Sequence, residues 1–139
     1  MLASLWGSSE GIALSPSGRI VSGPTFRSLQ AAWSDGVAAI ARAGAAIILD
    51  EVFLSGAAAQ KRWATVLDGL PVLWVGLRCD PDVAAAREAT RDDRVRGMAA
   101  SQATLVHRGV IYDIEIDTAR TSPRDCAQII VDRIGLNAG

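Results

Sequence analysis

The chain contains 139 residues, of which 50% are hydrophobic and 21% charged, and its formal net charge is -1. This composition argues against a disordered chain and against nucleic-acid binding, while the length suits a single domain with a buried core. No stretch approaches the roughly 18 apolar residues of a membrane span, and MLASLW lacks the basic start of a signal peptide, so we predict one soluble cytoplasmic domain over residues 1–139.

The first part of the chain predicts a hairpin followed by an amphipathic helix. Residues 7–23 contain four glycines, and IALSPSGRIV within this range is typical of a small hairpin that turns at residues 15–18; a mobile loop is the alternative. From Pro24 to the stop at Gly44, apolar residues recur every three or four positions, which predicts a helix. Its inner stripe consists of Phe26, Leu29, Trp33, Val37 and Ile40.

The next segments predict a parallel strand, helix, strand unit. Residues 46–49 form an apolar run that is too short for a helix and ends at Asp50, which favours a strand buried on both faces. Ser55 can cap a helix that runs to about Leu67, and a second strand covers residues 71–77. Such a unit implies a right-handed parallel crossover.

The remaining part predicts a helix, a strand and a terminal helix. Asp80, which precedes a proline, indicates a helix over residues 83–90 that continues with or without a break to Val106. Residues 110–117 alternate between apolar and polar side chains, which indicates a strand near the edge of a sheet. The S-x-x-[DE] pattern that starts at Ser122 predicts the cap of the terminal helix.

Two groups of charged residues could carry chemistry. Asp50 and Glu51 follow the first predicted strand, at the sheet edge where parallel sheets bind ligands, and an acid there can hold Mg²⁺ or orient a hydroxyl. The alternative is that one of them caps the following turn. Arg87, Arg91 and Arg94 are spaced to share one face of a continuous helix, and guanidinium groups suit phosphate oxygens. The alternative is a solvated face balanced by neighbouring acids.

Other residue types suggest structural roles. His107 is the sole histidine and is interpreted as structural or exposed, because the sequence shows no orienting partner for a general base. Cys79 and Cys126 are interpreted as small buried thiols rather than a disulfide or a metal site. Most of the tryptophans fall on predicted inner faces, which favours core packing.

Two long segments carry a family resemblance: GPTFRSLQAAWSDGVAAIARAGAAIILDEVFLSGAAAQKRW and VLWVGLRCDPDVAAAREATRDDRVRGMAASQATLVHRGVIYDIEID. In order and spacing they closely resemble the chloramphenicol phosphotransferase family, and the similarity runs from about Gly11 to the terminal helix. The resemblance implies an α/β fold of the P-loop kinase type, with a parallel sheet in three layers. It also implies a kinase that uses ATP and Mg²⁺ to phosphorylate a primary hydroxyl of chloramphenicol, a small-molecule partner, and so gives antibiotic resistance.

The resemblance also implies roles for individual residues. Arg91 and Arg94 match the lid arginines that approach the nucleotide phosphates, within a lid-like segment over residues 87–97. Asp50 matches the acid that ends the strand beside the phosphate loop, so these three residues are the candidate catalytic residues and the two arginines the candidate cofactor-binding residues. Arg87 matches an arginine of the family pattern to which no contact is assigned, and no protein-held metal ion is expected.

The sequence departs from the family in one important respect. It contains no phosphate-binding loop of the form G-x-x-x-x-G-K-[ST], and its only lysine is Lys61. The family's first strand and its base aspartate also have no equivalent, so we expect an N-terminally truncated, incomplete kinase domain. The alternatives are a non-catalytic remnant and a related kinase with another acceptor. A homo-oligomer, in which another copy supplies a strand, is also left open.

Overall fold

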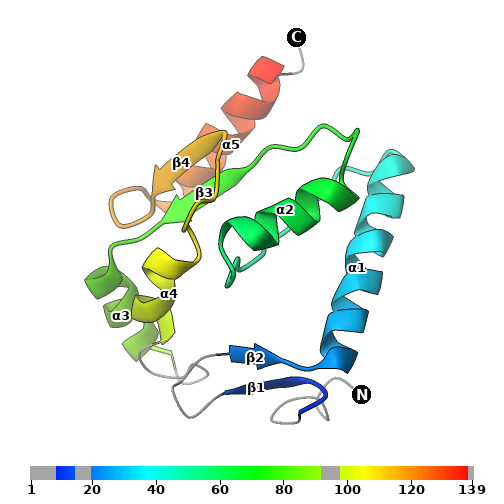
Figure 1. The fold of residues 1–139 in the computed structure, drawn as a ribbon. Coiled ribbons are helices and arrows are strands. Elements are labelled where there is room, and N and C mark those ends of the chain that lie inside the picture. The colour runs from blue at the N-terminus through cyan, green and yellow to red at the C-terminus, as the bar shows by residue number, and fades with distance from the viewer. Residues whose placement is uncertain (1–8, 15–19, 92–97, 138–139) are drawn as a thin grey trace. The chain divides into compact units, whose positions relative to one another are not determined.

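The structure is a computed structural model that describes residues 9–14, 20–91 and 98–137. Its contacts divide the chain into two compact units, of which the first holds residues 1–48 and 66–70 and the second holds residues 49–65 and 71–139. The elements, shown in Figure 1, are β1 (Ile12–Leu14), β2 (Ile20–Ser22), α1 (Pro24–Arg42), α2 (Ala57–Val66), β3 (Val75–Arg78), α3 (Pro81–Ala89), α4 (Met98–Leu105), β4 (Ile114–Asp117) and α5 (Pro123–Asn137).

The first unit contains the hairpin and helix α1. β1 pairs antiparallel with β2, and this pairing agrees with the predicted hairpin, whose turn lies outside the described residues. Glu10 ties the hairpin to the start of α1: its carbonyl oxygen accepts from the amide of Phe26 at 3.0 Å, and its carboxylate accepts from the Thr25 hydroxyl at 2.8 Å. The first of these bonds satisfies a backbone amide that the first turn of a helix otherwise leaves without a partner.

Helix α1 begins at Pro24 as predicted, but its apolar stripe is mostly exposed. Val37 is buried, whereas Trp33 is 58% exposed, so the prediction that Trp33 packs in a core is wrong. Leu29 and Ile40 of the same stripe are also exposed. Besides α1, the described part of the first unit contains only the hairpin with its flanking residues and the short segments 43–48 and 66–70.

The second unit is built on two parallel strands. β3 pairs with β4 in a register that places Gly76 opposite Glu115 and Leu77 opposite Ile116. Because side chains alternate across a strand, one face of the pair carries polar groups and the other face is apolar, with Ile116 buried. α5 then begins with the predicted cap at Ser122, whose hydroxyl accepts from the amide of Asp125 at 3.2 Å and donates to the Asp125 carboxylate at 2.6 Å.

Helix α2 docks through its side chains in the second unit. The predicted helix is confirmed, and Trp63 is only 5% exposed. The side-chain amide of Gln60 pairs with both backbone groups of Ile111, and the bond from the Ile111 amide is 3.0 Å long. The amide of Ala57 donates to the carbonyl of Arg108 at 3.0 Å. These bonds hold α2 against the segment that leads to β4.

The predicted strand over residues 46–49 is wrong. These residues have no regular secondary structure, and the side chain of Ile48 is 100% exposed. An apolar, β-branched segment becomes a strand only when a neighbour accepts its backbone hydrogen bonds, and no strand of the described residues pairs with it. The predicted crossover between this segment and β3 is therefore absent from the described residues.

The fold class is α/β, as predicted, but its sheets are small. The described residues form two two-stranded sheets, and β3 with β4 is the parallel pair. The predicted three-layer architecture around a larger parallel sheet is therefore not found in the described part of the chain. A parallel strand pair is still present, and its carboxyl ends define the edge on which the candidate site is built.

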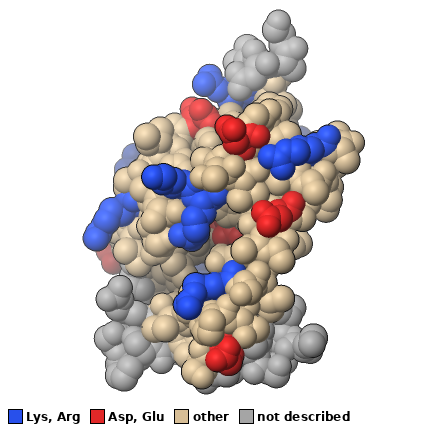
Figure 2. Space-filling view, turned by 45° about the vertical axis from the view of Figure 1, so that its right-hand side comes forward, with Lys and Arg blue, Asp and Glu red and all other residues tan. Residues whose placement is uncertain are grey.

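The surface carries both signs of charge, as Figure 2 shows for the face in view. Two ion pairs, Arg78–Glu115 and Arg120–Asp117, involve side chains that are about half exposed or more. Exposed pairs contribute only about 0–1 kcal/mol, so these pairs are minor contributors to stability. Among the described residues, no helix is long and apolar enough to cross a membrane.

Candidate active site

The carboxyl ends of β3 and β4 are joined by a group of residues that we call the strand-end cluster: Arg78, Cys79, Arg87 and Thr118. Nη2 of Arg87 donates to the carbonyl oxygen of Thr118 at 2.8 Å, and its Nη1 lies 3.7 Å from Sγ of Cys79. Thr118 donates from its amide at 2.8 Å and from Oγ1 at 2.9 Å to the carbonyl oxygen of Arg78. The ends of both strands are thus tied to each other and to α3.

Helix α3 starts immediately after β3 because Asp80 caps it. The Asp80 carboxylate accepts from the amides of Asp82 at 2.9 Å and Val83 at 3.3 Å, and Pro81 takes the first helical position. This confirms the cap that the sequence predicts. The carboxyl end of a parallel strand and the amino end of the next helix form the edge at which such folds bind anions.

The expected stripe of three arginines on one continuous helix is wrong for the described part of the segment. α3 ends with Thr90 as its C-terminal cap, and the amide of Arg91 donates to the carbonyl of Glu88 at 3.0 Å in a tighter turn. The Thr90 hydroxyl donates to the carbonyl of Arg87 at 2.8 Å, which competes with continuation of the helix. Arg91 is exposed just beyond the helix, and Arg94 lies outside the described residues.

Glu88 has a structural role that sequence reasoning missed. Its side chain is 8% exposed, and Oε1 accepts from the amide of Ala99 at 2.8 Å. This bond holds the first turn of α4 against α3. The sequence suggested only that Glu88 offsets neighbouring arginines, because the contact depends on how α3 and α4 pack and has no local pattern that would reveal it.

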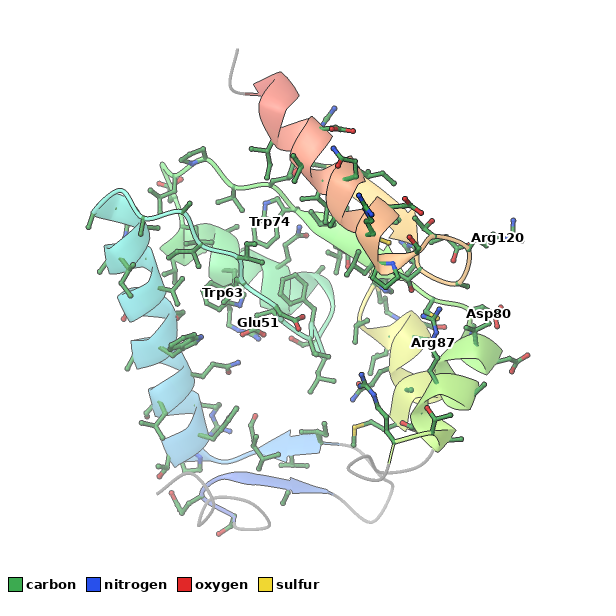
Figure 3. The ribbon with its side chains drawn as sticks, turned by 180° about the vertical axis from the view of Figure 1, so that it is seen from behind. Glu51, Trp63, Trp74, Asp80, Arg87 and Arg120 are labelled. Atoms are coloured by element: carbon green, nitrogen blue, oxygen red, sulfur yellow. The ribbon has the colours of Figure 1, made fainter. Side chains whose placement is uncertain are left out.

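Asp50 and Glu51 lie in the irregular segment before α2, and Figure 3 labels Glu51. Asp50 is exposed, whereas Glu51 is partly buried, and burial raises the pKa of Glu51 above its ordinary value of 4.5. The charge of Asp50 raises this pKa further, while a hydrogen bond from the Val52 backbone and the charge of Arg62 lower it. A carboxylic acid with a raised pKa is a better candidate for holding or accepting a proton than an exposed one.

The structure does not bring these acids and the arginines into direct contact. Within residues 49–91, no hydrogen bond or ion pair links Asp50 or Glu51 to Arg87 or Arg91. Among all described residues, no group of three His, Cys, Asp or Glu side chains could hold a metal ion. Mg²⁺ in kinases is usually bound through one or two protein carboxylates, with phosphate oxygens and water as its other ligands, and Asp50 and Glu51 are two carboxylates adjacent in the sequence.

His107 belongs to a polar network on one face of β3 and β4, which agrees with a structural role. Its Nδ1 lies 2.7 Å from the hydroxyl of Tyr112, and the two rings meet edge to face with centroids 5.6 Å apart. Arg78 lies over the Tyr112 ring and pairs with Glu115. Burial and the charge of Arg78 lower the pKa of His107. This network adjoins the strand-end cluster through Arg78.

A comparison with protein families shows to which family the chain belongs. The sequence profile of a family described as chloramphenicol phosphotransferase-like protein matches residues 1–135. The chain belongs to this family. No individual curated protein matches the chain. The chloramphenicol phosphotransferase-like family consists of kinase-like phosphotransferases with a P-loop kinase-like fold, so the match confirms the resemblance noted in the sequence.

Cationic groups occur at the carboxyl ends of β3 and β4 of this family member. A phosphotransferase must stabilise negative charge on the transferring phosphoryl group, and fixed guanidinium groups do this well. Arg87 is already bonded to protein acceptors, whereas Arg91 is exposed. Arg120, in the loop after β4, is 90% exposed and pairs only loosely with Asp117 at 3.6 Å (Figure 3).

Proposed function

We propose that this chain acts as an ATP-dependent O-phosphotransferase on a hydroxyl group of a small molecule, with chloramphenicol as the first acceptor to test. Family membership supports the reaction class. One structural observation carries the proposal to a site: α3 begins at the carboxyl end of β3, is tied to the end of β4, and leads directly to the exposed Arg91. This is the sheet edge where a parallel α/β fold binds nucleotides.

In this proposal, the arginines bind the phosphates and the acidic residues bind the metal ion. Arg91 pairs with phosphate oxygens and offsets the charge that moves during transfer, together with Arg94. Asp50 and Glu51 would hold Mg²⁺ through their carboxylate oxygens, and the ion would supply positive charge for phosphate transfer. The acceptor is a small alcohol rather than a nucleic acid or a membrane, and the proposed setting is the cytoplasm, where ATP is plentiful.

The 139 residues contain no phosphate-binding loop with a lysine. The competing proposal is therefore that the chain is a family member that does not transfer phosphate. The test compares two proteins. One is the 139-residue chain, and the other also includes the residues encoded by any in-frame codons upstream. Each is incubated with Mg²⁺ and ATP, and chloramphenicol phosphate is measured by mass spectrometry.

The proposed function predicts that at least one of the two proteins forms chloramphenicol phosphate and ADP in equal amounts. Transfer to another small alcohol, but not to chloramphenicol, would keep the reaction class and replace the acceptor. If neither protein phosphorylates any alcohol in a panel of primary and secondary hydroxyl compounds, the non-catalytic proposal replaces this one. An Arg91→Met variant serves as the matched control, because background hydrolysis of ATP by contaminants would not depend on Arg91.

A further inference from the structure

We propose that Arg87 is a positioning residue that acts through Arg91, and that it does not itself bind phosphate. This inference rests on the proposed function, which assigns Arg91 to the phosphates. Arg87 and Arg91 look equivalent in the sequence, since both are arginines in one basic segment. Both residues are exposed, and the structure separates them by their contacts: the Arg87 side chain bonds to Thr118 and Cys79, which lie after the ends of β4 and β3.

The contacts of Arg87 use both ends of its guanidinium fork. Nη2 donates to the Thr118 carbonyl at 2.8 Å, and Nη1 lies 3.7 Å from Sγ of Cys79. An arginine binds phosphate best with two parallel donors, and both terminal nitrogens of Arg87 already have protein acceptors. Each of these contacts uses one N–H of a terminal nitrogen, so a phosphate held by both terminal nitrogens would have to share them with Thr118 and Cys79.

These bonds close a ring through three separate chain segments. Thr118 follows β4 and is fixed by two bonds to the carbonyl of Arg78, at 2.8 and 2.9 Å. Cys79 follows Arg78 directly, and Asp80 then starts α3, which carries Arg87 back to Thr118. The ring therefore sets both the position and the rotation of α3 relative to the ends of the two parallel strands.

The position of α3 sets the position of Arg91. The amide of Arg91 is bonded to the carbonyl of Glu88 at 3.0 Å, so its backbone follows the last turn of the helix. Glu88 also ties α4 to the same turn through Ala99. If Arg87 is removed, α3 loses its bond to the end of β4 and Arg91 is placed less accurately, although its own charge and reach are unchanged.

Accurate placement matters more for the rate than for ground-state affinity. A displacement of about 1 Å at a reacting group can reduce the rate about 100-fold, whereas an exposed charge still attracts ATP at long range. We therefore expect Arg87→Met to lower kcat about 10- to 100-fold with little change in KM for the acceptor. Arg87→Lys, which can make one of the two contacts, should recover part of the loss.

A double-mutant cycle tests whether Arg87 acts through Arg91. The kcat for phosphate transfer is measured for Arg87→Met, Arg91→Met and the double variant, in the version of the protein that transfers phosphate. Arg133→Met is the matched control, because Arg133 is exposed on α5 and has no hydrogen bond or ion pair with the described residues. The inference predicts that the double variant is no slower than Arg91→Met alone.

Three results would overturn the inference: effects on kcat that multiply in the double variant, an Arg87→Met variant that behaves like Arg133→Met, or a rise in KM for ATP with kcat unchanged. The first would make Arg87 independent of Arg91, and the third would make it a direct ligand of the nucleotide. A simple loss of stability would not reproduce the predicted pattern, because it would lower the rate in both Arg91 backgrounds.

Hydrogen exchange without nucleotide separates this inference from the proposed function. Arg87→Met should increase amide exchange in α3 and at Thr118 relative to the unchanged protein, while Arg91→Met and Arg133→Met should not. If this pattern is seen and no version transfers phosphate, the proposed function fails while the structural part of the inference stands. If exchange in α3 is unchanged by Arg87→Met, the inference fails whatever the activity.

Discussion

The identity of Gly76 is constrained by the neighbouring ring of Tyr112. A Cβ added at Gly76 would lie 2.7 Å from the ring of Tyr112, which packs directly against the strand. Tyr112 in turn is held by its hydrogen bond to His107. The glycine is therefore required by a close approach of side chain to backbone, even though strands usually disfavour glycine.

We predict that Gly76→Ala destabilises the protein by about 1–3 kcal/mol, because the aromatic ring must shift to admit the new methyl group. Urea denaturation measures the change in the free energy of unfolding. The matched control is Gly36→Ala in α1, where the added Cβ meets no described atom within 4 Å. That change should be neutral or stabilise by up to about 1 kcal/mol, since alanine favours helix. Equal effects at both positions would contradict the packing at Gly76.

His107 predicts a pH dependence of stability. Burial and the Arg78 charge place the pKa of folded His107 below its ordinary value of 6.5, so the unfolded chain binds this proton more tightly. The contribution of His107 to the free energy of unfolding should therefore be constant above about pH 6.5. It should fall as the pH drops below this value, where histidine in the unfolded chain becomes charged.

The comparison that isolates this effect uses His107→Asn, which keeps a polar group beside the Tyr112 hydroxyl and does not titrate. Between about pH 7.5 and about pH 5.5, the unchanged protein should lose more stability than this variant. The Glu115 charge acts in the opposite direction on the same pKa, so Glu115→Gln should make the loss larger. A pH profile that is identical with and without His107 would contradict the prediction.

At the scale of the elements, the stability of α3 depends on the cap at its start. The Asp80 carboxylate satisfies two amides that would otherwise have no partner within the helix. We predict that Asp80→Ala costs about 0.5–2 kcal/mol and that Asp80→Asn costs clearly less, because asparagine is also a good cap. Thermal unfolding of both variants checks this prediction, and equal loss in the two would show that charge rather than the cap is responsible.

The elements also show which features a sequence can reveal. Caps and helices depend on neighbouring residues, so the caps at Asp80 and Ser122 and the starts of α1 and α5 were predictable from local pattern. The strand over residues 46–49 was predicted wrongly, because strand formation requires a partner that composition alone cannot supply.

The candidate site was only partly predictable for the same reason. The sequence indicated that arginines near the end of a predicted strand could bind phosphate, and it placed Arg87 and Arg91 in one group. The bond from Arg87 to Thr118 joins residues 31 positions apart, and Glu88 meets Ala99 only because α3 and α4 pack together. Such long-range contacts distinguish Arg87 from Arg91, and the sequence alone does not show them.

At the scale of the whole molecule, the family match gives the reaction class, and the strand-end cluster belongs to the site that we propose for it. The match covers residues 1–135, and the cluster lies at the sheet edge where this type of fold binds nucleotides. The apolar stripe of α1 and the segment around Ile48 remain exposed in the described structure, so stability is concentrated in the second unit. Hydrogen exchange should therefore be slower in β3, β4 and α2 than in α1.

We propose that this chain belongs to an active phosphotransferase in which Arg91 pairs with the phosphate oxygens. The most direct measurement is the kcat for transfer of phosphate from ATP to chloramphenicol by the unchanged protein and by Arg91→Met, in the 139-residue and the extended versions. We predict transfer in at least one version and a loss of about 100- to 1,000-fold with Arg91→Met, as expected when a charge-stabilising donor is removed. Transfer that is unaffected by Arg91→Met, or no transfer by either version, would contradict the claim.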